Sequence, residues 1–249
     1  MPAGSGGDRV KAWFGRRASA RAPVAQRPLA VLVVGMHRSG TSVATEILQA
    51  LGLFIGAPEA LIGPSADNRR GHFELSAGVA LDNDLLREAG GTWDAPPPME
   101  SLEALAGRIL PPIEAWFAGR TAWAFKDPRL CLTLPVWMPA LAAHDVRIVH
   151  LMREPHAVAR SVVARNAARE LPASRFAKGE MGAADALALW AEYHRRACLY
   201  AERFDLPRLV VWYDALLRAP RSEVRRVAAF LGREHARRGA AARCVRPES

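Results

Sequence analysis

The sequence has few of the residues that mark a metal centre, a disulfide scaffold or a membrane span. Its three cysteines, Cys131, Cys198 and Cys244, lie far apart and form no C-x-x-C pair and no Cys/His ligand spacing. This indicates neither a zinc site nor a disulfide framework, so we expect no metal and take the cytoplasm as the default compartment. No apolar run approaches the roughly 20 residues needed to cross a membrane, so no transmembrane segment is expected.

Lysine is equally scarce. The chain has only Lys11, Lys126 and Lys178, so arginine supplies most of a formal net charge of +9. A basic protein suits anionic ligands, and nucleic acid is one class to weigh. Much of the charge lies at the two ends of the chain, and the basic residues carry neither interleaved aromatics nor a recognised binding module. We therefore expect no nucleic-acid partner.

Length and composition favour one folded domain with a basic tail at each end. A chain of 249 residues suits one or two domains, and half of its residues are apolar. Residues 1–28 are rich in Gly, Ala, Arg and Pro and lack the apolar core of a signal peptide, so we expect a flexible tail. The folded domain is expected over residues 29–232 and a second tail over 233–249. The sequence does not indicate the oligomeric state.

Short apolar runs alternate with segments of helical periodicity. Strands are predicted at 29–34, 122–125, 146–152 and 209–212. Helices are predicted at 41–51, 76–89, 101–118, 133–143, 155–170, 183–203 and 221–231. The alternation predicts an α/β fold whose parallel strands are connected by crossover helices. In such sheets ligands bind at the carboxyl ends of the strands.

The most informative segment follows the first strand. Gly35 and Gly40 are separated by four residues, and two hydroxyl residues come next. The glycines allow a tight turn and a close approach of the backbone to a ligand. Arg38 adds a guanidinium, and the helix start offers an anion the backbone N–H groups of Ser39, Gly40, Thr41 and Ser42. The segment predicts a phosphate-binding loop rather than a simple helix cap.

One residue separates this loop from the ATPase form. That form has Lys directly after the second glycine, where it reaches the β and γ phosphates. Thr41 stands at this position here. The loop can therefore hold a phosphate but lacks the part that handles a triphosphate. A P-loop small-molecule or nucleotide kinase, or a non-catalytic nucleotide-binding module, remains an alternative function.

A second candidate clamp follows the predicted strand 146–152. Arg153 comes at the end of this strand, and Ser161 lies two turns into the next helix, on a face that can look back toward it. An arginine with a hydroxyl can hold a second phosphate. Arginine after a strand is also often only solvated.

Two further segments carry candidate catalytic residues. Lys126 directly follows the predicted strand 122–125. The alternative to a catalytic role for Lys126 is a surface ion pair with Asp127. Gly71-His72-Phe73-Glu74 places a carboxylate after a loop. Either Glu74 or His72 could be a general base, and Glu74 could equally favour a helix N-terminus without any catalytic role.

Taken together, these segments resemble the sulfotransferases that use 3′-phosphoadenosine 5′-phosphosulfate (PAPS). Residues 35–42 resemble the 5′-phosphosulfate loop of that superfamily, and residues 68–74 resemble the acceptor-side segment of its bacterial members. Lys126-Asp127-Pro128-Arg129 is similar to a block also seen in tyrosylprotein sulfotransferases. Residues 153–166 resemble the 3′-phosphate block, and a weaker likeness continues from Tyr213 to Gly232.

The resemblance implies a three-layer, P-loop-like α/β fold with a central parallel sheet flanked by helices. It implies PAPS as the donor and a hydroxyl or amine of a carbohydrate or small metabolite as the acceptor. By this likeness, Arg38 and the loop residues Gly35, Ser39, Gly40, Thr41 and Ser42 hold the 5′-phosphosulfate, and Arg153 and Ser161 hold the 3′-phosphate. Arg38 and Lys126 stabilise the charge of the transfer step, and Glu74 is the candidate base. No metal is implied.

Overall fold

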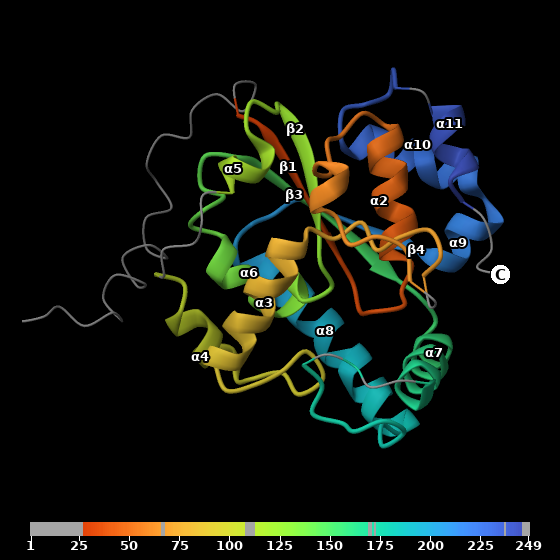
Figure 1. The fold of residues 1–249 in the computed structure, drawn as a ribbon. Helices are drawn as coiled ribbons and strands as arrows, with labels where there is room; N and C mark the ends of the chain where they lie inside the picture. The colour runs from red at the N-terminus through yellow and green to blue at the C-terminus, as the bar shows by residue number, and fades with distance from the viewer. Residues whose placement is uncertain are drawn as a thin grey trace, which may run out of the picture.

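The computed structural model describes residues 27–65, 68–107, 113–168, 171, 173–236 and 238–245. Its strands form a parallel sheet in the order β2-β1-β3-β4 (Figure 1). The strands are β1 (Leu29–Val34), β2 (Ala122–Lys126), β3 (Asp145–Met152) and β4 (Arg208–Trp212). Each predicted strand is confirmed to within one residue, and each is a short apolar run whose length suits a strand better than a helix.

The side chains of β1 show why the sheet lies between two layers of helices. Ala30, Leu32 and Val34 belong to one apolar cluster, and Val31 and Val33 belong to the other. Successive side chains of a strand point to opposite faces, so a strand that is apolar throughout must be covered on both. The predicted three-layer α/β fold is confirmed.

The helices divide between the two faces, as Figure 1 shows. One face is covered by α2 (Thr41–Ala50), α9 (Tyr213–Arg218), α10 (Pro220–Phe230) and α11 (Arg238–Arg243). The other is covered by α3 (Ser76–Glu88), α4 (Met99–Ala104), α5 (Glu114–Phe117), α6 (Leu130–Trp137), α7 (Pro155–Ala168) and α8 (Ala183–Arg203). A short 3-10 helix, η2 (Pro58–Ala60), lies in the long connection after α2.

Two predicted helices are wrong in extent. The segment 101–118 holds α4 and α5 instead of one helix, and α4 ends before Gly107. Glycine disfavours helix continuation, and the sequence adds two prolines at 111 and 112. The helix predicted at 133–143 is α6, which begins three residues earlier and ends before Pro139. All eight residues of α6 are buried, so the helix has no polar face whose period could mark its ends.

The structure also contains two short helices that the sequence reading did not predict, α9 and α11. Each has six residues, too few for a clear periodic pattern. The second lies within 233–249, the segment expected to be a loose tail, and its Ala241 is fully buried. The helix α11 packs against α10 and α2. No helix in the described ranges is long and apolar enough to cross a membrane.

Candidate active site

The loop between β1 and α2 has the tight backbone that its glycines predict. Gly35 and Gly40 adopt positive φ angles of 145° and 87°. A Cβ atom at Gly35 would lie 2.5 Å from the carbonyl oxygen of Leu151, and one at Gly40 would lie 2.3 Å from the Tyr213 ring. Both positions therefore require glycine on two grounds, conformation and space. Arg38 also has a positive φ, 70°, a rare conformation for a residue with a side chain.

The structure brings the two predicted phosphate-binding segments together. The Nε atom of Arg38 donates a hydrogen bond to the Ser161 hydroxyl at 2.9 Å. A guanidinium nitrogen of Arg153 donates to the Arg38 carbonyl at 3.0 Å. Arg38 and Ser161 are 123 residues apart in the chain, so this meeting is a product of the fold. Two guanidinium groups and a hydroxyl form a site suited to a phosphorylated ligand.

Arg153 is positioned from two sides. Its guanidinium carbon lies 4.7 Å from the centre of the Tyr213 ring, a cation–π distance. Its own carbonyl accepts a hydrogen bond of 3.2 Å from the indole of Trp190 on α8. Because Tyr213 also packs against Gly40, one aromatic ring contacts both predicted phosphate-binding segments.

The loop contains two buried polar atoms that make no hydrogen bond within the described residues. They are the Ser39 hydroxyl oxygen and the Nε2 atom of His37. Buried polar atoms without partners are uncommon and mark positions that a ligand or water can satisfy. The ring of His37 lies 4.9 Å from that of Trp93 in an edge-on contact, so the 90–98 connection reaches the loop. Burial first, then the charge of Arg129, holds the pKa of His37 well below its usual value.

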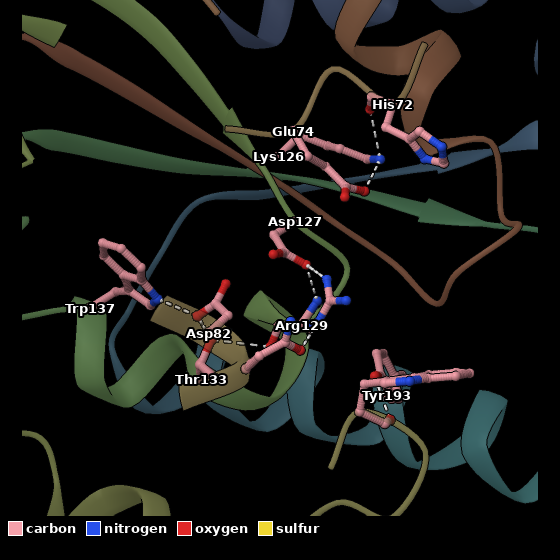
Figure 2. Close-up of polar contacts among 11 residues, drawn as sticks. His72, Glu74, Asp82, Lys126, Asp127, Arg129, Thr133, Trp137 and Tyr193 are labelled. Atoms are coloured by element: carbon pink, nitrogen blue, oxygen red, sulfur yellow. Dashed lines mark hydrogen bonds and ion pairs between the residues drawn. The ribbon is translucent and has the colours of Figure 1, made fainter. Parts of the chain in front are cut away.

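The predicted catalytic residues form a second cluster beside the loop (Figure 2). The Nζ atom of Lys126 lies 2.5 Å from Glu74 Oε1 and 3.0 Å from the carbonyl oxygen of His72. Lys126 and Glu74 are almost completely buried. The hydroxyl of Ser42, in the first turn of α2, is 3.4 Å from the same His72 carbonyl. The two clusters therefore meet at the start of α2.

The electrostatics of Glu74 reflect two opposing effects. Burial raises the pKa of its carboxyl, but the nearby Lys126 ammonium and then Arg129 lower it, and the net shift is downward. Glu74 is therefore ionised at neutral pH. The Nε2 atom of the His72 imidazole lies 2.8 Å from the Ser65 hydroxyl, while the backbone carbonyl of His72 contacts Lys126.

A buried polar network supports the strand end that carries Lys126 (Figure 2). Asp127 Oδ1 accepts hydrogen bonds from the backbone N–H and the guanidinium of Arg129, at 2.8 and 2.9 Å. Arg129 also reaches Asn83 on α3. The Asp82 carboxylate accepts from Thr133 and Trp137 on α6, at 2.7 and 2.8 Å. Burial, followed by the charge of Asp127, raises the pKa of Asp82.

Four residues that contact the site were given no role from the sequence. Cys131 accepts a hydrogen bond of 3.2 Å from the Gly35 N–H, and Asn68 donates one of 3.1 Å to Ser42. Tyr213 and Trp190 position Arg153. Their residue types occur throughout protein cores, so no local pattern distinguishes them. The Tyr213 block was the weakest of the five likenesses and carried no assigned role.

A cavity of about 310 Å³ lies between the 90–98 connection and α8. Its lining includes Asp94, Pro96, Arg175, Phe176 and Leu189. Trp93, the neighbour of Asp94 in the chain, contacts the loop at His37. In the described ranges, no three His, Cys, Asp or Glu side chains lie together in a way that could hold a metal ion.

Comparison with known proteins gives one family. A model of the sulfotransferase family matches residues 28–237. A search of curated proteins found no significant match.

Several solved structures resemble the chain at low identity. A sulfotransferase domain from the curacin biosynthetic pathway is 15% identical with a TM-score of 0.48, over 82% of this chain and 74% of that one. Sulfotransferase STF9 from Mycobacterium avium is also 15% identical with a TM-score of 0.48, over 94% and 70%. Retinol dehydratase in complex with retinol and PAP is 20% identical with a TM-score of 0.44, over 88% and 64%. These likenesses are too low to transfer site residues.

Proposed function

Because the chain belongs to the sulfotransferase family, we propose that it transfers a sulfuryl group from PAPS to a hydroxyl or amine of a carbohydrate or small metabolite. The observation that carries the proposal is the meeting of Arg38, Arg153 and Ser161. Such a donor has a phosphosulfate at the 5′ position and a phosphate at the 3′ position, so it needs two anion sites close together. The two segments predicted to bind these anions contact each other in this chain, which supports the proposal.

The residues present fit the donor. The loop leaves no room for side chains at Gly35 and Gly40, and its Ser39 hydroxyl is buried without a partner in the described residues. We assign the 5′-phosphosulfate to the loop residues 35–42. Arg153 and Ser161 are assigned to the 3′-phosphate. Arg38 lies between these groups and so can serve both the loop and the transferring group.

Arg38 and Lys126 are the proposed catalytic cations. The donor supplies an activated sulfuryl group, and its transfer develops negative charge on the leaving oxygen. Fixed positive groups that face such charge lower the barrier, since they need no reorganisation during reaction. Lys126 is buried and held by two oxygen partners, so its ammonium has a defined position. Alignment of the acceptor contributes the rest.

Glu74 is the proposed general base. It is ionised at neutral pH, as a base must be, and it lies beside Lys126. The same ion pair lowers its affinity for a proton, so Glu74 gains strength as a base as the fixed Lys126 charge is shared with the negative charge that develops on the leaving oxygen. His72 is the second candidate, and a Glu74→Gln variant separates the two. If turnover falls while donor binding stays intact, Glu74 is the base, whereas unchanged turnover moves the role to His72.

Calorimetric titration with 3′,5′-ADP, 5′-AMP and ATP tests the donor assignment. We expect tight binding of 3′,5′-ADP alone, because only this nucleotide fills both anion sites. The double variant Arg153→Ala/Ser161→Ala is expected to lose the preference for the 3′-phosphate. A preference for ATP would instead favour the kinase alternative, and a preference that survives the double substitution would remove Arg153 and Ser161 from the site.

A further inference from the structure

The residue that follows a helix outside the matched family region contacts the proposed acceptor-side segment. The family model ends at residue 237, and α11 begins at Arg238. The helix packs on α10 and α2, and its Ala241 is completely buried. It ends beside Cys244, whose carbonyl oxygen points toward the 68–74 segment. The helix α11 is therefore a packed part of the fold, whereas the sequence predicted a loose tail over residues 233–249.

Arg70 makes the connection. One guanidinium nitrogen donates a hydrogen bond of 2.9 Å to the Cys244 carbonyl, and the other forms an ion pair with Glu46 of α2. Arg70 thus joins three parts of the molecule: the end of α11, the middle of α2 and the segment that leads to Glu74. Arginine suits this task because its planar group offers several donors in fixed directions.

The segment held by Arg70 carries the proposed catalytic contacts. Gly71 follows with a positive φ of 99°, and the carbonyl of the next residue, His72, accepts hydrogen bonds from Lys126 and Ser42. A shift of Arg70 therefore moves the oxygen that positions the Lys126 ammonium. Backbone hydrogen bonds from Ile62 and to Ile62 hold the same segment from its other side.

We propose that Arg70 is a positioning residue, through which α11 and α2 fix the His72–Glu74 segment for acceptor chemistry. This inference rests on the proposed sulfuryl transfer for its effect on turnover, but its structural part does not. Arg70 contacts Glu46 and Cys244 and neither Arg153 nor Ser161, so we expect its effect to fall on the acceptor side and 3′,5′-ADP binding to stay intact. A displacement of the order of 1 Å at such a site can lower the rate by about 100-fold.

The chain offers a matched control at the neighbouring position. Arg69 is exposed, and its side chain makes no hydrogen bond or ion pair with another described residue. Arg70→Ala and Arg69→Ala remove the same charge and the same number of atoms. The side chain of Arg70 is itself 40% exposed, so we expect its removal to leave the fold intact. Any difference between the two variants reports the contacts with Glu46 and Cys244.

The experiment measures hydrogen–deuterium exchange of the 68–75 peptide, affinity for 3′,5′-ADP and turnover in both variants. We expect faster exchange of this peptide and a fall in kcat of about 100-fold for Arg70→Ala only, with unchanged 3′,5′-ADP affinity in both. Equal exchange in the two variants would overturn the inference. If the unmodified protein does not bind 3′,5′-ADP, the proposed function is overturned instead. The comparison of hydrogen exchange between Arg70→Ala and Arg69→Ala would still decide the role of Arg70.

Glu46→Gln provides an independent second variant. It removes the negative charge of one Arg70 partner. The side chain keeps nearly the same shape, and the contact between Arg70 and Cys244 remains. We expect exchange of the 68–75 peptide between that of the unmodified protein and that of Arg70→Ala. If Glu46→Gln exchanges at the same rate as the unmodified protein and Arg70→Ala is unfolded, Arg70 serves stability rather than the position of the segment.

Discussion

At the scale of single residues, Arg38 links the two predicted phosphate-binding segments through both its side chain and its backbone. Its backbone takes a left-handed conformation, which turns the side chain toward Ser161 while its carbonyl accepts from Arg153. Such strain in a residue with a side chain is held in place by the surrounding contacts and is common at functional sites. The backbone of this residue is thus as important for the site as its charge.

Arg38→Ala is expected to abolish most of the transfer and to leave the fold intact. The residue is half-buried and its side chain is not part of either apolar cluster. Removal of one fixed group that stabilises transition-state charge typically costs about 3–4 kcal/mol, or about 100- to 1,000-fold in kcat. Turnover with an acceptor identified by screening gives the rate, and circular dichroism gives the fold. A variant that retains the unmodified kcat would exclude Arg38 from catalysis.

Lys126→Met tests the buried ion pair with Glu74. The substitution leaves a buried carboxylate without its cation, which typically costs about 3–5 kcal/mol of unfolding free energy. Adding Glu74→Gln removes the uncompensated charge, so the double variant should regain part of that loss. Urea unfolding of both variants measures the two free energies. If the single variant is as stable as the unmodified protein, the ion pair in Figure 2 is not a strong contact in solution.

Individual residues were predictable from sequence where a motif specified them. Arg38, Arg153 and Ser161 were predicted to share one site through the family resemblance, and the convergence of strand ends in a parallel sheet agrees with that prediction. Arg70 could not be predicted in this way, since its partners lie on α2 and at the end of α11, and an arginine beside Arg69 in a loop looks like ordinary surface charge. The contacts of Arg129 with Asn83 and of Asp82 with α6 were missed for the same reason, because they join segments about 50 residues apart in the chain.

At the scale of elements, the loop between β1 and α2 is closed by its neighbours. The backbone at Gly35 lies against the end of β3, and the backbone at Gly40 lies against the Tyr213 ring at the start of α9. The loop therefore has the strand on one side and the helix on the other. Its shape depends on both contacts being tight, which suits a site that must hold an anion in a fixed orientation.

Gly40→Ala is expected to destabilise the protein and to weaken binding of 3′,5′-ADP. An added Cβ would overlap the Tyr213 ring, and the φ of 87° is unfavourable for alanine. Gly52→Ala is the control, because its φ of 91° is similar but no atom lies within 4 Å of its Cβ position. The control should cost only the conformational strain, about 1–2 kcal/mol. Thermal unfolding and calorimetry of both variants check this, and equal losses would mean that the ring contact is not needed.

Helices and strands were predicted accurately where they were long enough to show a clear apolar pattern. The strands and α8 were predicted closely, because each has a clear apolar run or a long helical period. The completely buried α6 and the six-residue α9 and α11 lack such a pattern. Their ends are set by packing against other elements, and the local sequence carries no information about that packing.

At the scale of the whole molecule, acid stability is expected to depend on a buried histidine pair. His150 on β3 and His194 on α8 share a hydrogen bond of 2.7 Å. Burial, then the charges of His194 and Arg208, lowers the pKa of His150 to about 3, and burial lowers the pKa of His194 to about 4. Both histidines are neutral in the fold, whereas the unfolded chain protonates them near pH 6.5.

The sign of the effect follows from proton uptake. Between pH 6.5 and about 4 the unfolded state binds more protons, so stability falls as the pH falls, by up to about 1.4 kcal/mol per pH unit for each histidine. Urea unfolding at pH 7 and pH 5 measures the slope. His194→Asn should reduce it, and His156→Gln, which changes an exposed histidine, should not. An unchanged slope in His194→Asn would show that the pair does not govern acid stability.

The position of β1 in the sheet has a consequence for synthesis of the chain. This strand is made first, yet its partners β2 and β3 end at residues 126 and 152. A growing chain therefore carries the apolar run Val31-Leu32-Val33-Val34 without either neighbour until residue 126 has left the ribosome. Unpaired apolar strands of this kind are prone to association. Fragments that stop before residue 152 should aggregate, and chaperones should bind nascent chains through β1.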